Sequence, residues 1–562
     1  MQIVECVPNF SEGRDRGVID AIAGSIARVA GVRLLDVDPG EATNRTVMTF
    51  VGPPAAVSEA AFAAIEAAAR LIDMRSHTGA HARQGATDVC PFVPVAEVGM
   101  DECVALAREL GARVGGQLGI PVYLYEQAAT RPERRSLQVV RAGEYEGLAE
   151  KLATPEGAPD FGPAAFNARS GATAVGARKF LIAYNINLNT RDVRIARAIA
   201  WRIRDSEGPI RGPDRTLVRD EAGTLVKAPG RFEHCKATGW TIEEYGCAQV
   251  TMNLTDWEVT PIHAVFDACC ELAEEQGARV TGSEIVGLVP RGPLLAAGAH
   301  YLRRQGLSPG APAGEVIRVA VRSLGLSDVA PFDPARKVIE DVLIDPGALV
   351  ERRLSSFTEA TSAGTPVPGG GSAAAVSGAL SASLVAMVAN LAAESRKTPA
   401  GRRARLGRVA ERAQVLREWM LAAVDQDSRA YDEVVKAGRM PRKSDADKDA
   451  RSAALARATA HAARVPFSVL ERTVELLEMS RQLIDDGLES SLSDAGVAAL
   501  EAAAAAEGAH YNVLVNLPGF ADQVEADELN NRACLLLDRT HHLANEVRSI
   551  VLERLLTSSS GC

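Results

Sequence analysis

The chain lacks several features that would each define a class of protein. No run reaches the roughly 18 uninterrupted apolar residues that a membrane span needs, and Met1 to Asn9 lack a basic segment followed by an apolar one. The nine cysteines include no CxxC pair, which argues against a zinc site or a disulfide framework. We therefore expect a protein without membrane segments, in the cytosol, with reduced thiols.

Basic residues are also too few for a nucleic-acid partner, whose phosphates demand clustered Lys and Arg. The formal net charge is -10 and the pI is about 5.6. No Walker motif is present, because no Lys follows the one glycine run, and no GxGxxG follows a strand-like segment. These absences favour small-molecule ligands that are not nucleotides.

What the chain does contain is a sharp change of character at Val367-Pro368-Gly369-Gly370-Gly371-Ser372. Upstream, prolines and β-branched runs dominate; downstream, Ala, Leu, Arg and Glu recur at helical spacing. The 562 residues and the 47% hydrophobic content allow two or three cores. We predict a multidomain protein with an α/β (α+β) N-terminal half made of two subdomains and an all-α helical bundle at the C-terminus.

In the N-terminal half, strand-like and helical stretches alternate. A first subdomain is expected over residues 1–180, a second over 181–325 and a proline-containing linker over 326–355, followed by the helical domain 356–562. Residues 207–237 read as a long hairpin or surface loop. The strands expected there are 2–8, 32–37, 45–51, 122–125, 179–187 and 248–254, and the helices are 18–29, 55–71, 101–118, 191–203 and 260–276.

The C-terminal half is predicted to be an antiparallel bundle with small side chains that allow close helix packing or a dimer seam. Pro466 should kink or break the third of its helices. The expected helices are 372–394, 401–438, 446–486, 493–516 and 526–557.

The polar loop Ser76 to Gly85 contains two histidines, His77 and His81, together with Arg83. A loop histidine titrates near neutrality, which suits general acid/base catalysis. Two histidines four residues apart are equally compatible with a structural role. A metal site would need a third ligand, and none stands out nearby.

Asp427 interrupts an apolar helical stripe. At 3.6 residues per turn it shares a face with Met420, Val424 and Tyr431, whereas Asp425 points away and reads as a solvated charge. A buried acid is costly unless it is paired or functional, and its raised pKa would suit proton transfer. We favour function over a satisfied structural acid.

Two further groups of residues are candidates for a site in the helical domain. The backbone of Gly369, Gly370 and Gly371 at a helix start could meet an anion such as folate's glutamyl carboxylates, with Ser372 simply capping the helix as the alternative. Asn512 and Asn516 share a helical face, where they would suit pterin edges or a structural role equally well.

Several long motifs carry a resemblance to known families. ECVPNFSEGRD, LLDVDPGEATNRTV, LIDMRSHTGAHARQGATDVCPFVPV and PDFGPAAFNARSGATAVGARKFLIAYNIN resemble the formiminotransferase family. PVPGGGSAAAVSGAL, Asp427, SDAGVAAL and NVLVNL resemble the cyclodeaminase family. Together they cover nearly the whole chain, in the order of the bifunctional formimidoyltransferase-cyclodeaminase family.

The resemblance implies two reactions. The first moves a formimino group from N-formimino-L-glutamate to N5 of tetrahydrofolate, with His81 as the catalytic base; Asp38 or Asp88 would orient it. The second cyclises 5-formiminotetrahydrofolate to 5,10-methenyltetrahydrofolate with loss of ammonia, with Asp427 supplying a proton. The folate-contacting segment would consist of Gly162, Pro163, Ala164, Ala165, Phe166, Asn167, Ala168, Arg169, Ser170 and Gly171.

The substrate's carboxylates need cations, for which Arg45, Arg83, Arg178 and Lys179 are candidates. Tetrahydrofolate is the implied cosubstrate, and no metal, nicotinamide or flavin is expected. The family's oligomeric habit implies at least a homodimer.

The chain departs from the family pattern at three places. Thr78 and Ala82 stand where the family usually has Lys and Pro, and Glu489 lies where an asparagine is common. A narrower alternative is a glutamate formimidoyltransferase whose helical half is a dimerising scaffold, or a methenyltetrahydrofolate cyclohydrolase.

Overall fold

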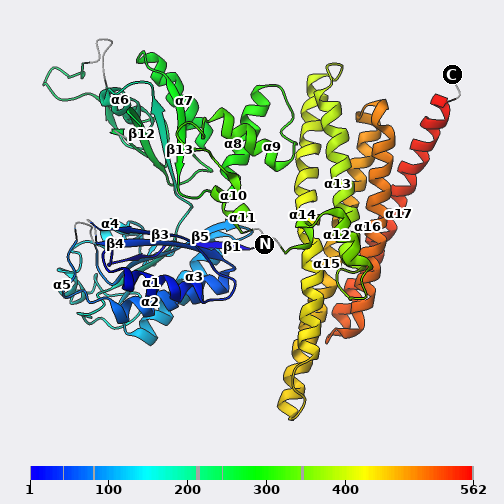
Figure 1. The fold of residues 1–562 in the computed structure, drawn as a ribbon, viewed down its shortest axis with the longest axis horizontal. Coiled ribbons are helices and arrows are strands. Elements are labelled where there is room, and N and C mark those ends of the chain that lie inside the picture. The colour runs from blue at the N-terminus through cyan, green and yellow to red at the C-terminus, as the bar shows by residue number, and fades with distance from the viewer. Residues whose placement is uncertain are drawn as a thin grey trace. The chain divides into compact units, whose positions relative to one another are not determined.

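The computed structural model describes residues 2–41, 44–79, 83–210, 216–242, 245–343 and 347–559. The chain forms two compact units: Met1–Pro290 with Ala335–Leu343, and Arg291–Pro334 with Ile344–Cys562. The strands of the described chain all belong to the first unit, and the second is helical (Figure 1). The predicted change from a mixed fold to an all-helical one is therefore confirmed.

A seven-stranded sheet forms the N-terminal part of the first unit. The strand order is β1-β4-β2-β5-β7-β6, with β3 added beside β4. All pairs are antiparallel except β5–β7 and β6–β7, which are parallel. The strands are β1 (Ile3–Cys6), β2 (Asn9–Phe10), β3 (Arg33–Gly40), β4 (Arg45–Gly52), β5 (Thr87–Ala96), β6 (Val122–Glu126) and β7 (Thr173–Ala177).

The alternation of side chains along β4 fixes the two faces of this sheet. Thr46, Met48 and Phe50 are buried, while Arg45 and the other odd-numbered residues at the start of the strand are only half-buried. Met48 and Phe50 join a core made with helices α1 (Arg16–Ala27), α2 (Pro54–Leu71) and α3 (Met100–Arg113). Arg45 therefore points to the opposite, partly open face.

That opposite face is covered in part by two short helices. Helices α4 (Leu137–Val140) and α5 (Leu148–Leu152) supply Val140, Leu148 and Leu152 to a second small core with Val89 and Tyr125 of the sheet. Because α4 ends at Val140, the chain delivers Arg141 to the edge of this covered region.

A four-stranded antiparallel sheet, ordered β11-β12-β8-β13, forms the second part of the first unit. Helices α6 (Val193–Ile203) and α7 (Ile262–Glu275) pack against it. The predicted hairpin within residues 207–237 is confirmed as the pair β9 (Gly208–Pro209) and β10 (Lys227–Ala228). The sheet's strands are β8 (Ile182–Leu188), β11 (Cys235–Ile242), β12 (Cys247–Leu254) and β13 (Val280–Val286).

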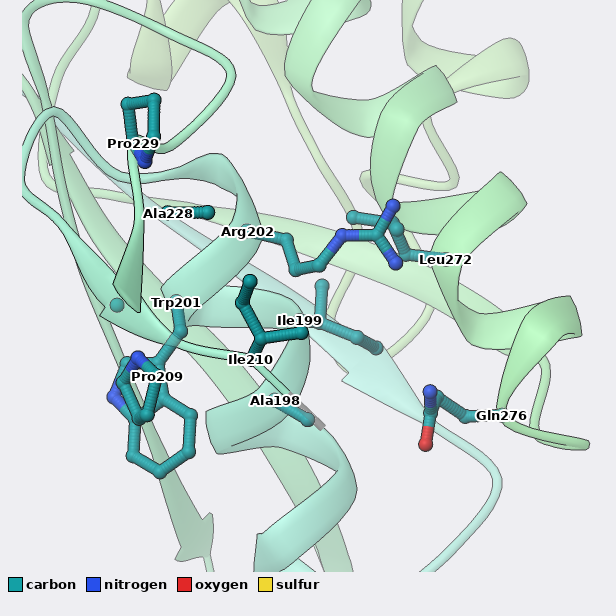
Figure 2. A pocket seen from close by; sticks show the side chains of 11 residues that line it. Ala198, Ile199, Trp201, Arg202, Pro209, Ile210, Ala228, Pro229, Leu272 and Gln276 are labelled. Atoms are coloured by element: carbon teal, nitrogen blue, oxygen red, sulfur yellow. The ribbon is translucent and has the colours of Figure 1, made fainter. Parts of the chain in front are cut away.

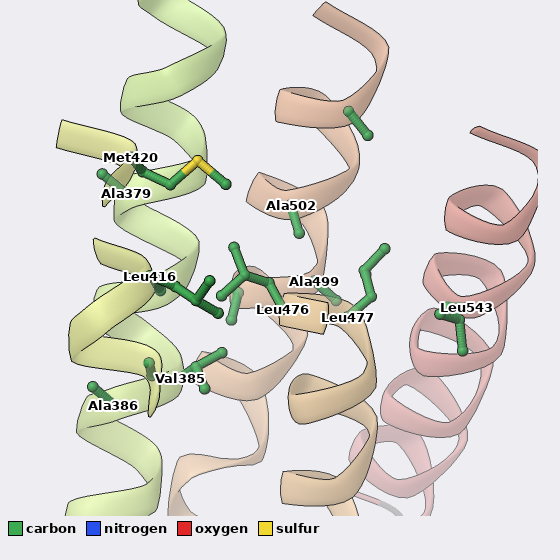
Figure 3. Packing of buried hydrophobic residues seen from close by; sticks show 14 of the residues in the cluster. Ala379, Val385, Ala386, Leu416, Met420, Leu476, Leu477, Ala499, Ala502 and Leu543 are labelled. Carbon is green, nitrogen blue, oxygen red and sulfur yellow. The ribbon is translucent and has the colours of Figure 1, made fainter. Parts of the chain in front are cut away.

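The second unit has one large core of Ala, Val and Leu side chains (Figure 3). Small residues allow the helices to approach closely: a Cβ on Gly378 of α13 would lie 2.7 Å from the sulfur of Met420 on α14. The long helices are α13 (Gly370–Glu394), α14 (Ala400–Gly438), α15 (Asp445–Asp486), α16 (Leu492–Asn516) and α17 (Gln523–Ser559), close to the predicted ranges.

In the described chain, five shorter helices, α8 to α12, lie between the second sheet and the long helices of the bundle. Helices α8 (Arg291–Arg304) and α9 (Ala313–Ser323) group with the helical unit, as does α12 (Leu354–Ser362). Between them, α10 (Pro334–Lys337) and α11 (Ile339–Val342) lie at the return to the first unit, where Val338 forms a β-bridge with Val289.

The predicted break at Pro466 is wrong, because α15 continues through this residue as one helix. Proline has no N–H to donate to the carbonyl four residues earlier, which is that of Ala462. The Nδ2 of Asn516 on α16 donates to this carbonyl instead, at 3.3 Å. A neighbouring helix thus satisfies the acceptor that the proline leaves open.

Of the described helices, α13 alone is long and apolar enough to cross a membrane, by length and composition only. Its most apolar window of 18 residues is 61% buried inside the molecule. One such helix is weak evidence for a membrane span, because the buried core helix of a soluble protein passes the same test.

Candidate functional site

Backbone hydrogen bonds bring the predicted folate segment against both ends of the histidine loop. The hydrogen bonds run from Met74 N–H to Arg169 O (2.9 Å), from Ala86 N–H to Ser170 O (2.9 Å) and from Ala172 N–H to Gln84 O (3.0 Å). Gly171 has φ +65°, and a Cβ there would overlap the carbonyl oxygen of Gln84. Glycine is therefore required where the two segments meet.

Only part of the loop itself can be described. His81 and Ala82 lie outside the described residues, so the assignment of His81 as catalytic base stays a prediction. The Nε2 of His77 lies 2.9 Å from the carbonyl oxygen of Asn44. Arg83 holds the other side of the loop through Glu146, at 2.7 Å, and this hydrogen bond raises the pKa of its guanidinium.

Asn44 links three of the sequence motifs, although no pattern in the sequence distinguishes it from its neighbours. Its Oδ1 accepts from Gly13 N–H at 3.0 Å, and its Nδ2 donates to the carbonyl of Thr78 at 2.9 Å. Asn44 is buried and has φ +47°, a conformation that asparagine tolerates better than most residues. Thr78, which stands where the family usually has Lys, takes part in this contact only through its backbone carbonyl.

Charged side chains gather on the open face of the seven-stranded sheet beside this loop. Asp88 on β5 is buried; it accepts from Gln84 N–H at 3.1 Å and forms an ion pair with Arg141. Arg45 on β4 lies within electrostatic range of Asp88, Arg141 and Asp38. The candidate residues Asp38 and Arg45 are thus brought together, and Arg141 is added to the group.

The folate segment presents one exposed aromatic side chain. Phe166 is 40% exposed, and its ring lies 5.4 Å from that of Tyr145, between centroids. Tyr145 also donates from its hydroxyl to the carbonyl of Ala168, at 2.5 Å. Asn167 and Arg169 mainly fix the segment's own backbone and its contact with α2. A flat ligand ring would find an aromatic face here.

In the helical unit, Asp427 of α14 lies against the start of α13. Ser372 Oγ is 3.0 Å from Asp427 Oδ2, and a Cβ on Gly371 would overlap the carboxylate. Burial raises the pKa of Asp427, while the side-chain and backbone hydrogen bonds from Ser372 oppose this shift. The predicted apolar stripe is buried at Met420 and Val424, but the prediction is wrong for Tyr431, which is 41% exposed.

The GGGS segment therefore faces Asp427. Helix α13 begins at Gly370, so Ser372 lies inside its first turn and makes no cap hydrogen bond; the capping alternative is wrong. Gly369 is the residue that precedes the helix. A Cβ on Gly370 would lie 3.5 Å from Asn512 Nδ2, which places Asn512 at the same spot.

The structure also gives the roles of Asp425 and Asn516 in this unit. Asp425 is not solvated: it is 9% exposed and accepts from the N–H groups of Leu349 (2.8 Å) and Val350 (3.4 Å). The helical wheel missed this because the donors come from a distant segment. Asn516 uses its amide group on the carbonyls of Ala462 and Asn512, a structural role.

A separate pocket of about 220 Å³ lies in the second part of the first unit (Figure 2). Its lining is mostly apolar and includes Trp201, Ile210 and Leu272. The charged lining residue Arg202 pairs with Glu275 at 2.8 Å. The lining of this pocket includes none of the predicted site residues.

The fold and these two groups of residues define a class of protein. An α/β unit carries a charged site beside a glycine-anchored loop, and a helical unit carries a half-buried carboxyl group with a raised pKa. This is the organisation of a two-site enzyme acting on small molecules.

Comparisons with known proteins identify the family. "Formiminotransferase domain, N-terminal subdomain" matches residues 3–178, "Formiminotransferase domain" matches 183–344, and "Formiminotransferase-cyclodeaminase" matches 353–534. A formimidoyltransferase-cyclodeaminase of Sus scrofa is 41% identical over 558 residues, which is 99% of each chain. The chain belongs to the formimidoyltransferase-cyclodeaminase family.

Each half also has a relative of its own. A glutamate formimidoyltransferase of Streptococcus pyogenes is 40% identical over 302 residues, covering 54% of this chain and 94% of the relative. A methenyltetrahydrofolate cyclohydrolase of Methylorubrum extorquens is 35% identical over 175 residues, covering 31% of this chain and 84% of the relative.

Proposed function

We propose that this chain transfers the formimino group of N-formimino-L-glutamate to tetrahydrofolate and then closes the product to 5,10-methenyltetrahydrofolate with release of ammonia. The observation that carries the proposal is similarity over 99% of the chain to a protein named for both activities. The relatives support both activities, formimidoyltransferase and cyclodeaminase, over a transferase whose helical half is only a scaffold.

In the first reaction, N5 of tetrahydrofolate attacks the amidine carbon, N5 loses a proton and the departing glutamate nitrogen gains one. His81 is the proposed base and acid, since one imidazole can perform both transfers in turn. The pterin would lie on the segment 162–171, whose exposed Phe166 supports this placement. Asn44 and the backbone of Gly171 would hold the loop in position.

In the second reaction, N10 attacks the formimino carbon, ammonia leaves and the ring closes. Asp427 is the proposed proton donor to the leaving nitrogen, because burial raises the pKa of its carboxyl group and favours the protonated form. The reaction involves no change of oxidation state.

The test uses the purified full chain with formiminoglutamate and tetrahydrofolate, and follows methenyltetrahydrofolate absorbance and ammonia. The wild type should make both products, His81→Ala neither, and Asp427→Ala only the formimino intermediate. A wild type that stops at the intermediate would show that the helical unit is a scaffold. Conversion of added methenyltetrahydrofolate without ammonia release would favour the cyclohydrolase activity instead.

We also propose that the protein is at least a dimer and acts in the cytosol, in histidine degradation. Exposed large apolar side chains on the neighbouring helices α16 and α17 support self-association, because exposed apolar surface on one side of a protein often marks an interaction site. The most exposed of them are Tyr511 (62%), Val515 (73%), Val524 (66%), Leu535 (70%) and Leu556 (67%). Light scattering on the purified chain tests the dimer; a monomer at all concentrations would exclude it.

A further inference from the structure

The four cations that could meet substrate carboxylates are not equivalent in the structure. Lys179 is already paired with Asp256 (2.6 Å) and Glu258 (2.9 Å). Arg83 is paired with Glu146 (2.7 Å) and lies 3.4 Å from Glu144. Both charges are balanced by carboxylates of the protein itself, so neither is available to a ligand without breaking an ion pair.

The side chain of Arg178 also has partners within the protein. Its guanidinium donates to the carbonyl of Lys179 at 3.1 Å, and it lies within electrostatic range of the buried carboxyl group of Glu5. Arg178 therefore serves the sheet rather than an open site.

Arg45 differs from these three residues. Its side chain is half-buried, and within the described ranges it forms neither a hydrogen bond nor an ion pair. Its Nε is fully enclosed and has no acceptor among the residues that the structure describes. Burial and the nearby charge of Arg141 both lower the pKa of Arg45, whereas Asp88 and Asp38 raise it. A guanidinium stays charged in proteins, so within the described residues this half-buried charge has carboxylates nearby but no direct ion-pair partner.

Neighbouring polar atoms on the same face are also without partners. The Nε of Arg141 is buried and unpaired, although another nitrogen of this guanidinium binds Asp88. Asn9 lies opposite Val47, two residues from Arg45, and its Oδ1 is unpaired although the residue is only 8% exposed. Buried polar groups in native proteins almost always have partners, so several open ones on one face require an explanation, and a bound polar ligand supplies one.

The position of these atoms fits the first of the two reactions. Arg45 directly follows Asn44, which holds the histidine loop through His77 and Thr78. Asp88, which pairs with Arg141, follows the same loop along the chain. A substrate whose carboxylate reached Arg45 would have its other end near this loop.

We propose that Arg45, with Arg141 beside it, binds a carboxylate of the amino-acid substrate, and that this contact makes the transferase site specific for a glutamate derivative. The proposal rests on the proposed function. Planar guanidinium groups bind carboxylates through two parallel hydrogen bonds, which fixes orientation as well as charge. The glutamyl tail of folate carries the same group, so the test must separate the two sources.

The experiment compares the full chain with Arg45→Met, Arg45→Lys and Arg194→Met. Arg194 is an exposed arginine of the same unit that forms an ion pair with Asp192, two residues away, and it serves as the matched control. Transferase rates are measured while formiminoglutamate and tetrahydrofolate monoglutamate are varied separately. Calorimetric titration with L-glutamate provides a readout that does not depend on turnover.

Arg45→Met should raise the KM for formiminoglutamate by roughly 10- to 100-fold, the loss expected for a charge-assisted hydrogen bond, and leave the KM for tetrahydrofolate within about 2-fold. Arg45→Lys should recover part of this loss because it keeps the charge. L-Glutamate binding should weaken by a similar factor in Arg45→Met and stay unchanged in Arg194→Met.

A rise in the KM for tetrahydrofolate alone, or a lost preference for its polyglutamates, would assign Arg45 to the folate tail and overturn the proposal. Unchanged kinetics in Arg45→Met would overturn it as well. If the wild type transferred no formimino group, the proposed function would fail; weaker L-glutamate binding in Arg45→Met would still support the carboxylate site, and unchanged binding would overturn it.

Discussion

At the scale of single residues, one hydroxyl group is shared by more acceptors than it has protons. Ser372 Oγ lies 3.0 Å from the carbonyl oxygen of Val424, 3.0 Å from Asp427 Oδ2 and 3.1 Å from Ser428 Oγ. A serine hydroxyl donates only one hydrogen bond. When that proton goes to Val424, Asp427 must itself be protonated to keep a hydrogen bond with the hydroxyl of Ser372, although the backbone N–H of Ser372 still reaches the carboxyl group. The protonation of Asp427 is therefore linked to the orientation of this hydroxyl.

Ser372→Ala should raise the pKa of Asp427 further, because the side-chain hydrogen bond from Ser372 lowers it against the effect of burial; the backbone hydrogen bond remains in the variant. The limb of the pH–rate profile for cyclisation that Asp427 controls should move to higher pH. The profile is measured with 5-formiminotetrahydrofolate added directly, and Ser428→Ala, one contact further away, should shift it less. A lower rate with an unshifted limb would show that Ser372 has only a packing role.

Glu5 gives a prediction for stability. It is 4% exposed, and burial raises the pKa of its carboxyl group from 4.5 to about 7 despite the opposing charge of Arg178. The folded chain therefore holds this proton more tightly than the unfolded chain, and unfolding releases it. The free energy of unfolding should fall as pH rises from 4.5 to about 7, by up to about 3 kcal/mol.

Glu5→Gln should remove this part of the pH dependence, since its amide does not titrate. Denaturant unfolding of both proteins at pH 5 and pH 8 measures the difference. The variant should gain stability relative to the wild type at pH 8. Equal slopes in the two proteins would contradict the raised pKa.

At the scale of helices, Asn516 and Pro466 form a pair whose members depend on each other. Asn516→Ala should cost about 1–2 kcal/mol of stability, because the buried carbonyl of Ala462 loses its donor. In a Pro466→Ala background the new N–H would supply that carbonyl from within α15, so the same substitution should cost clearly less. Thermal unfolding of the four proteins forms a double-mutant cycle. An identical cost in both backgrounds would disprove the coupling.

The helical half could be predicted closely from sequence because its apolar spacing and its breakers are local signals. The strands β5, β7, β11 and β13 were not predicted as such, since short apolar runs around glycines and prolines do not identify a strand by themselves. Asp427 was found because it interrupts a stripe on its own helix. Arg141 and Asn44 were missed because their partners lie on other strands and loops, and pairing between distant segments leaves no periodic pattern.

At the scale of the whole molecule, the family boundary and the compact units divide the chain differently. The formiminotransferase match extends over 183–344, whereas residues 291–334 pack with the helical unit. The contact is specific: the carbonyl of Gly310 accepts from Asn390 Nδ2 (2.8 Å) and Gln414 Nε2 (3.0 Å), and Arg303 pairs with Glu411 at 2.8 Å. A Cβ on Gly310 would overlap Ala410 of α14.

A truncated chain of residues 345–562 should consequently be less stable than one of residues 291–562, by several degrees in Tm. The shorter chain loses the acceptor for Asn390 and Gln414 and uncovers the surface around Ala410, and two lost hydrogen bonds with apolar burial amount to a few kcal/mol. Both fragments retain Asp427 and the GGGS segment, so both should cyclise added 5-formiminotetrahydrofolate at low temperature. Thermal unfolding followed by circular dichroism gives the comparison. If the two fragments melt together, α8 and α9 contribute nothing to the helical unit, and the boundary at residue 344 is also the physical one.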